Sequence, residues 1–279
     1  HAPEDRVRRL IAAGLALPGT VTDLPVTAQA FSSRRVDGSP NVLLAVAVEG
    51  SEIGMMLTPN GERRISLDIH SIALEGTQQI DEAHEQLIAR STDEGRFEAV
   101  NDKPVTPRLI GYLAYQHEWT LGPATYTFNV AVVDNVTGRV GATSVEIEVP
   151  PYTDEDEWGI SDPLLVTVDD AGRVHPVVLG RYVPGDNVVA LVEVYGGQRP
   201  ILSGQVFLET TGPDQGKQGA RLFPLAMRPT AGGVHRGMVP LPAGMPPGRY
   251  FVQLVITDPP VDEHKIVRLP IEVVAAPIR

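Results

Sequence analysis

Cysteine is absent from this 279-residue chain. The absence excludes disulfides, zinc sites built on thiolates and catalytic thiols, but it does not identify the compartment, because exported proteins can also lack cysteine. No run approaches the roughly 18 uncharged apolar residues of a membrane-spanning helix. Residues 1–5, HAPED, lack the basic and apolar regions of a signal peptide. We expect no membrane insertion, and since the chain begins at His1 without Met we interpret it as a fragment of a longer protein.

Basic residues are also few, with 23 Lys and Arg against 35 Asp and Glu, which gives a net charge of −12. A surface with this charge repels phosphate backbones and anionic lipid headgroups, so nucleic acid is a poor candidate partner. The hydrophobic fraction of 42% is that of an ordinary globular protein, and the length is sufficient for two hydrophobic cores. We therefore expect a folded chain of two domains.

Helical patterning is scarce and is confined to the N-terminus. Two acids at positions 4 and 5 suit the start of a helix, and apolar residues then recur with helical spacing over residues 7–14. From Leu24 onward, short runs rich in Val and Ile alternate with turn residues at the spacing typical of β-sandwiches. The expected strands are 25–31, 42–48, 66–74, 85–89, 109–116, 125–133 and 144–149 in the first half, and 164–168, 188–194, 204–210, 221–227, 234–239, 249–257 and 266–274 in the second. This pattern predicts an all-β fold of two tandem immunoglobulin- or fibronectin-III-like β-sandwich domains, preceded by a short N-terminal helix.

A break in the β pattern marks the expected domain boundary. After Val149 come two prolines and then a run of four acids, none of which suits a central strand. The acids are Asp154, Glu155, Asp156 and Glu157. The sequence therefore predicts a helix and lead-in at residues 1–19, a first sandwich at 20–150, an acidic linker at 151–162 and a second sandwich at 163–279.

An internal repeat supports two copies of one fold. The segment GPATYTFNVAVVD at 122–134 parallels PPGRYFVQLVITD at 246–258, and IEV follows each tyrosine at the same distance. Because strand side chains alternate between the two faces of a sheet, the spacing also predicts the core. The inward residues are Tyr126, Phe128, Val130 and Val132 in the first copy, and Tyr250, Val252, Leu254 and Ile256 in the second. A buried tyrosine at this position needs a hydrogen-bond partner, usually a backbone group.

The acidic run is the candidate metal site of the sequence. Calcium prefers several oxygen ligands, which Asp154, Glu155, Asp156 and Glu157 can supply. No Asp-x-Asp-x-Asp-Gly loop is present, so we interpret the run as a solvated linker and keep calcium as the alternative. No other cofactor is indicated.

Two His-Glu pairs begin like the zinc-binding His-Glu-x-x-His helix. They are His84-Glu85 and His117-Glu118, and the position of the second imidazole is apolar in both cases. Both pairs lie in strand-like sequence, where residues four apart are not helical neighbours. We interpret these residues as surface histidines, not as zinc ligands.

No catalytic residue is assigned from the sequence. It contains no Gly-x-Ser-x-Gly elbow, and the glycine-rich segment at 212–219 lacks the spacing of a phosphate loop. The segment DGSPN at 37–41 faintly resembles a von Willebrand metal motif, but we predict a hairpin loop there. The distance between two catalytic carboxylates cannot be read from a sequence. A hydrolase with its site in a cleft between the domains is therefore the alternative to a non-catalytic module.

Several short segments suggest a family. The first half carries LPV at 24–26, VLLAV at 42–46, LGPATY at 121–126 and TGRVG at 137–141, and the second carries YVPGD at 182–186, VEVY at 192–195 and PGRY at 247–250. Over residues 20–275 the chain resembles the region after the von Willebrand A domain in VWFA-related proteins of Acidobacteria and similar bacteria. The resemblance implies export to an extracellular or periplasmic location and a role in surface interaction, adhesion or assembly. It also implies attachment to, or assembly with, a von Willebrand A-type domain, which would hold the metal site upstream of His1, so no metal ligand is carried over.

These observations together favour a non-catalytic module that binds a protein or glycan through sandwich loops or edges, or that spaces a neighbouring domain.

Overall fold

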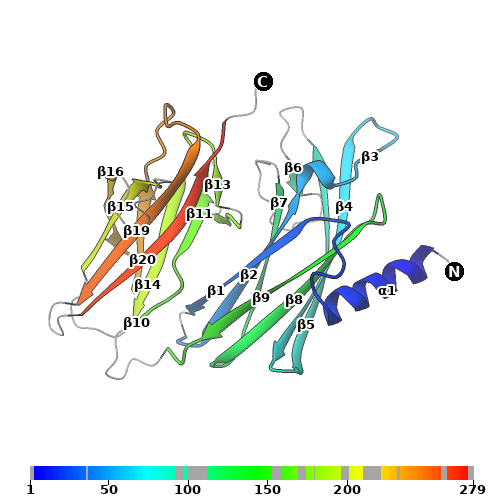
Figure 1. Ribbon diagram of the computed structural model, residues 1–279, viewed down its shortest axis with the longest axis horizontal. Coiled ribbons are helices and arrows are strands. Elements are labelled where there is room, and N and C mark those ends of the chain that lie inside the picture. Colours follow the sequence, from blue (N-terminus) through cyan, green and yellow to red (C-terminus); the bar gives the residue numbers. More distant parts are fainter. Residues whose placement is uncertain are drawn as a thin grey trace, which may run out of the picture. The chain divides into compact units, whose positions relative to one another are not determined.

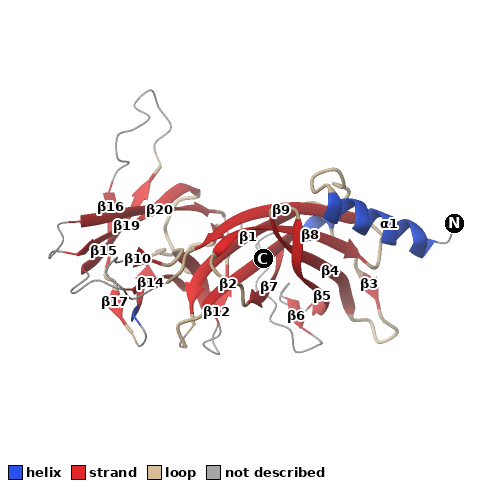
Figure 2. Ribbon diagram, turned by 90° about the horizontal axis from the view of Figure 1, so that it is seen from below, coloured by secondary structure: helices blue, strands red, loops and turns tan. Residues whose placement is uncertain are grey.

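The computed structural model describes residues 3–35, 37–91, 97–99, 112–152, 159–168, 174–178, 180–195, 201–209, 221–230, 233–258 and 263–275 (Figure 1). The chain divides into two compact units, one of His1–Ser32 with Pro40–Pro150 and one of Ser33–Ser39 with Pro151–Arg279. Strands dominate both units, and the α-helix α1 (Pro3–Ala16) belongs to the first (Figure 2). The prediction of an all-β, sandwich-type fold behind one short N-terminal helix is confirmed.

The first unit contains two sheets. The smaller has the order β1-β2-β7 and the larger the order β6-β5-β4-β8-β9, with β3 added against β4. Their bounds are β1 (Val26–Arg34), β2 (Pro40–Glu49), β3 (Met56–Leu57), β4 (Arg63–Glu75), β5 (Gln78–Ser91), β6 (Phe97–Ala99), β7 (Tyr112–Trp119), β8 (Ala124–Asp134) and β9 (Val140–Val149), with the 3-10 helix η1 (Gly50–Glu52) after β2. All seven strands expected in this half are present. The short strands β3 and β6 were not expected.

Strand β8 shows why alternation predicts the core. Its inward residues Tyr126, Phe128, Val130 and Val132 are at most 4% exposed, as expected. The Phe128 ring lies 5.4 Å from the ring of Trp119 on β7, so the two sheets of the unit meet at this pair. Burial of such apolar surface is the main force that holds the sheets together.

The opposite face of β8 is buried as well, because α1 covers it. The helix packs Val7, Leu10, Ile11 and Leu15 against a cluster of Val21, Ala131, Val133, Val140 and Ala142. Asn129 lies on the same face and donates from Nδ2 to the Leu15 carbonyl oxygen at 2.7 Å, near the C-terminal end of the helix. That carbonyl is among the last of the helix, which lack partners within it, so Asn129 satisfies a group that would otherwise be orphaned.

The second unit also contains two sheets. One has the order β12-β11-β14-β18-β17, with β10 added against β14, and the other has the order β13-β20-β19-β15-β16. Their bounds are β10 (Gly159–Ile160), β11 (Leu164–Val168), β12 (Val174–Pro176), β13 (Arg181–Tyr182), β14 (Val188–Tyr195), β15 (Ile201–Leu208), β16 (Arg221–Leu225), β17 (Arg228–Pro229), β18 (Val234–Val239), β19 (Gly248–Asp258) and β20 (Glu263–Val273). All seven strands expected in this half are present. Strand β10 falls within the segment expected to be a linker, and it pairs with Val194 and Tyr195 of β14.

The internal repeat is confirmed by strand register. Tyr126 of β8 pairs with Ile147 of β9, and Tyr250 of β19 pairs with Ile271 of β20, at the same sequence offset. Each tyrosine hydroxyl donates to the carbonyl oxygen four residues before it, at 3.0 Å to Gly122 and 2.8 Å to Pro246. This is the backbone partner expected for a buried tyrosine in a sandwich. The inward residues of β19 after Tyr250 are fully buried, as the parity argument requires.

Candidate functional site

The second unit carries an open groove on the outer face of its β12-β11-β14-β18-β17 sheet. On β14 the inward residues Val188, Ala190 and Val192 are buried, so the alternate residues face outward. The register sets outward Val189 opposite Val166 on β11 and opposite Met238 on β18. Pairing of three strands therefore brings apolar side chains from distant parts of the chain into one row.

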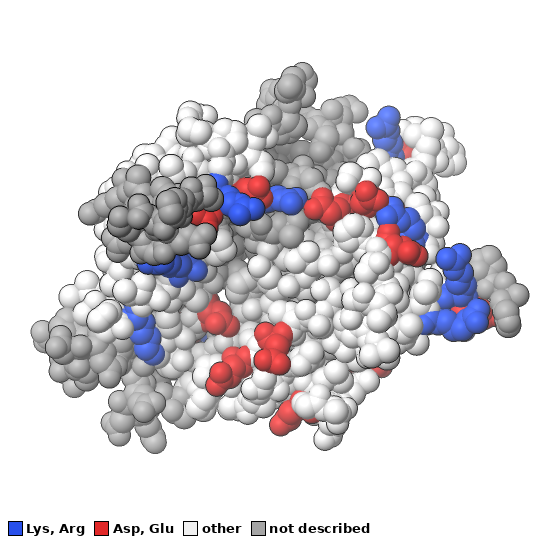
Figure 3. Space-filling model, in the orientation of Figure 1, with Lys and Arg blue, Asp and Glu red and all other residues white. Residues whose placement is uncertain are grey.

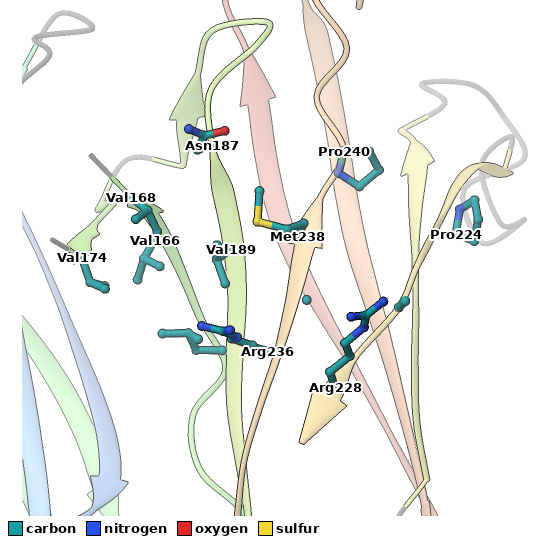
Figure 4. Close-up of a pocket in the computed structure, with 13 residues that line it drawn as sticks. Val166, Val168, Val174, Asn187, Val189, Pro224, Arg228, Arg236, Met238 and Pro240 are labelled. Atoms are coloured by element: carbon teal, nitrogen blue, oxygen red, sulfur yellow. The ribbon is translucent and has the colours of Figure 1, made fainter. Parts of the chain in front are cut away.

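The groove has an apolar floor and encloses about 900 Å³, within the size range of ligand sites (Figure 4). Its described lining residues are Val166, Val168, Val174, Asn187, Val189, Leu191, Pro224, Ala226, Arg228, Arg236, Gly237, Met238 and Pro240. Met238 is 56% exposed and Val174 is 44% exposed, so the groove is open to solvent at these two positions, whereas Val166 and Val189 between them are buried. Apolar side chains that remain exposed together in a concave surface indicate a binding site.

Gly237 allows the connection between β16 and β17 to approach the end of the groove at β18. The connection from β16 to β17 passes close to Gly237 on β18, where an added Cβ would lie 2.6 Å from Met227 Sδ and 3.0 Å from the Ala226 carbonyl oxygen. A larger residue would push this connection away. Because Gly237 has no side chain, the connection can pass close to β18, and Arg228, which follows Met227, pairs directly with Arg236.

Arg228 and Arg236 form a pair of like charges at this end. They are register partners on neighbouring strands, so their side chains leave the same face of the sheet. Both are exposed, and within the described parts of the chain neither has an ion pair or a side-chain hydrogen bond. Like charges directly opposite each other destabilise a sheet. The pair is unusual in a chain of net charge −12, whose acidic and basic side chains are interspersed over the face in Figure 3.

The carboxylate that β14 carries on this face, Glu193, is already bonded elsewhere. Glu193 is 5% exposed, and its Oε1 accepts from Arg34 Nε at 3.0 Å while its Oε2 accepts from the Arg34 backbone amide at 3.0 Å. The Arg34 guanidinium also lies 5.8 Å from the centre of the Tyr195 ring. Burial, with Glu193 nearby, raises the pKa of the Tyr195 hydroxyl. Because Arg34 occupies Glu193, this carboxylate does not neutralise the pair in the groove.

The described lining of the groove is mostly apolar, with one amide and two guanidinium groups. Its described lining contains no Asp, Glu, His, Ser, Lys or Tyr, the side chains that act as acids, bases or nucleophiles in hydrolysis. Asn187 is its single neutral polar side chain, and none of these residues is aromatic. A sugar ring would bury hydroxyl groups that need hydrogen bonds, and the lining offers few. The surface suits an apolar ligand that carries negative charge at one end.

A polar cluster in the first unit contains one of the predicted His-Glu histidines. His117 Nδ1 lies 3.3 Å from the Tyr115 hydroxyl and 3.9 Å from Glu85 Oε1. Burial, with Glu85 nearby, strongly raises the pKa of Tyr115, so this hydroxyl keeps its proton. Trp119, whose ring meets His117 edge-on, has its Nε1 buried without a hydrogen-bond partner. The contacts of this cluster supply acid and base groups but no serine nucleophile.

The other predicted histidine stacks on a histidine of the neighbouring strand. His84 on β5 is the register partner of His70 on β4, with ring centroids 4.1 Å apart and planes 9° from parallel. Stacked rings do not aim two nitrogens at one metal ion. In the described residues no group of three or more His, Asp or Glu could hold a metal. His84, Glu85, His117 and Glu118 all lie on strands, as the sequence predicted.

The histidine pair predicts a pH dependence of stability. Burial, and then the neighbouring His84, lower the pKa of His70 below 6.5, against a smaller opposite effect of Asp68. Below about pH 6.5 the unfolded chain therefore binds a proton that the folded chain resists, so stability is lost as the pH falls. We expect His70→Gln to flatten the free energy of unfolding between about pH 7 and 5. The exposed His264 is the control; an equal flattening by His264→Gln would contradict the assignment to His70.

Two predicted features remain, the acidic run at 154–157 and the hairpin loop at 37–41. Asp154, Glu155, Asp156 and Glu157 lie outside the described residues, so calcium binding there stays a prediction. Of the segment at 37–41, residues 37–39 form the turn between β1 and β2 and the last two begin β2; Asp37 Oδ1 accepts from the Ser39 amide and hydroxyl at 3.0 and 2.6 Å. These bonds lower the pKa of Asp37. The hairpin prediction at this position is confirmed.

Sequence reasoning missed the groove. Alternation within the expected strand at 234–239 puts Arg236 and Met238 on the same face, and a methionine and an arginine on one strand face were the signal that could have indicated the groove. Arg228 belongs to the two-residue strand β17, which has no pattern of its own. Its pairing with Arg236 is a contact between consecutive strands, and no pattern in the two-residue strand indicates it.

No protein-family model matches the chain, and no similar protein is found among the curated proteins. Among the described residues, no helix is both long and apolar enough to cross a membrane.

Proposed function

We propose that this chain is a non-catalytic interaction module that binds a partner protein through the groove of its second unit. The observation that carries the proposal is the apolar groove floor, in which Met238 and Val174 are exposed and Val166 and Val189 lie buried between them. Exposed apolar side chains gathered in a concave surface are the usual core of a protein-binding site. The resemblance to VWFA-related proteins supports, as part of this proposal, an extracellular or periplasmic setting next to a von Willebrand A-type domain.

The groove differs from the binding surface expected from the sequence. Loops and strand edges were the expected contacts, whereas the groove lies on a sheet face. The described lining favours a protein over a glycan, because it has one amide and no aromatic ring for a sugar. A peptide, in contrast, can place aliphatic side chains along the floor and keep its own polar backbone toward solvent.

A display library of random peptides tests the proposal. Peptides selected on the wild-type chain should bind about tenfold more weakly to Met238→Ser, because part of a buried methionine contact is lost. Ile266→Ser is the matched control, since Ile266 is 54% exposed on the other sheet of the same unit. Binding affinities are measured by calorimetry on the folded variants. If the recovered peptides bind Met238→Ser and wild type equally, the groove is not the binding surface.

A further inference from the structure

The arginine pair at the end of the groove is a charge arrangement that folding alone does not explain. Arg228 and Arg236 are register partners on β17 and β18, and the carboxylate of Glu193 on β14 is bonded to Arg34. Their mutual repulsion opposes folding and would be relieved by a bound anion. Guanidinium groups bind carboxylates through two parallel hydrogen bonds, which makes this pair a natural carboxylate site.

The dimensions of the groove indicate an extended chain. It crosses from β17 over β18 and β14 to β11, which is three inter-strand spacings or about 14 Å. An extended peptide rises about 3.3 Å per residue, so four or five residues span this distance. Alternate side chains of such a peptide point the same way. A carboxylate near the arginines would therefore be followed, at the second and fourth positions after it, by two side chains above the floor of Met238, Val189 and Val166.

We infer that the groove recognises an extended peptide segment in which one acidic residue, bound between Arg228 and Arg236, is followed or preceded by alternating apolar residues. This inference rests on the proposed function and names the ligand class of the same site. A free amphipathic carboxylate shares the chemistry of the ligand. The open floor favours the peptide, because small-molecule sites enclose most of their ligand, whereas Met238 and Val174 stay exposed here.

The arginines are suited to a clean test because they are exposed and have no described partner. Arg228→Gln and Arg236→Gln remove a guanidinium without opening the core, and they relieve the repulsion between the two strands. Both variants should therefore unfold at the same temperature as wild type or higher. Arg249→Gln is the matched control, since Arg249 is an exposed arginine on β19 of the other sheet.

The experiment uses the full chain and the peptides recovered from the display library. We expect peptides with Asp or Glu beside alternating apolar residues. Each should bind at least about tenfold more weakly to Arg228→Gln or Arg236→Gln, but not to Arg249→Gln, because a charge-assisted hydrogen bond is lost. Changing the acidic residue of the peptide to its amide should produce the same loss on wild type and little further loss on the arginine variants.

Two outcomes would overturn the inference. In the first, peptides depend on Met238 but bind equally well when their acidic residue is changed to its amide or when either arginine is replaced. This result would leave the proposed function intact and contradict recognition of a carboxylate. Sodium decanoate provides the other arm: if it binds with arginine dependence while no recovered peptide does, the ligand is a small amphiphile and not a peptide. Failure of every peptide to depend on Met238 would instead contradict the proposed function itself.

Discussion

Replacing Phe128 with alanine is expected to lower the free energy of unfolding of the first unit by about 3–5 kcal/mol. Phe128 is fully buried, and its ring meets Trp119 from the opposing sheet. Truncation removes the apolar contacts on both sides and leaves a cavity between the two sheets. A β8 strand that is packed on both faces has little freedom to collapse into that space.

Tryptophan fluorescence can isolate this effect. The chain has two tryptophans, so in a Trp158→Phe background Trp119 alone reports on the first unit. Thr127→Ala is the control, because Thr127 directly precedes Phe128 on β8, lies on the opposite face and is only half-buried. The expected loss in free energy of unfolding for this control is below about 1 kcal/mol. If Phe128→Ala lowers the free energy of unfolding by less than about 1 kcal/mol, Phe128 does not lie in the core as the alternation along β8 predicts.

The second large effect is expected at Gly141 on β9. A Cβ at this position would overlap the carbonyl oxygen of Leu24 in the segment that leads from α1 to β1. Backbone atoms cannot rotate away as a flexible side chain can, so the lead-in must separate from β9. Gly141→Ala should therefore cost about 3 kcal/mol, the upper part of the usual range for overpacking.

The change at Gly141 should also have a local signature. The Leu24 amide donates to the Val140 carbonyl oxygen at 3.2 Å, and the Ala142 amide donates to that of Val21 at 2.8 Å. Hydrogen exchange at these two amides should accelerate strongly in Gly141→Ala. Gly122→Ala is the matched control, since no heavy atom lies within 4 Å of a Cβ built there. Unchanged protection of Leu24 and Ala142 would mean that the lead-in accommodates the methyl group.

Alternation and repetition made much of the fold predictable. Inward residues such as Val130 and Leu254 are predictable because side chains alternate between the two faces of a strand, and a short stretch of sequence is enough to show this alternation. The matched Tyr126 and Tyr250 segments predicted two copies of one fold, and both hydroxyls have the expected backbone partner. The short strands β3, β6, β10, β12, β13 and β17 were missed, because two or three residues contain no period.

The candidate site was less predictable than the fold. The sequence directed attention to acids and histidines, whereas the groove is formed by aliphatic residues and two arginines that no motif connects. Val166, Val189 and Met238 are ordinary strand residues until they pair. Which strands pair depends on how distant segments bury their faces together, and the cost of closing the intervening loops does not appear in any local pattern.

The sequence by itself determined the fold class, the N-terminal helix, the repeat and the inward residues of each long strand, because these depend on local periodicity and turn chemistry. Only the tertiary structure decided that α1 covers the second face of β8, that Arg34 neutralises Glu193, and that Arg228 meets Arg236 beside an open apolar floor. The first two of these, and the apolar floor beside the arginines, depend on contacts between residues far apart in the chain. Such contacts form when strands from different segments settle into register, and that register is set by packing over the whole unit.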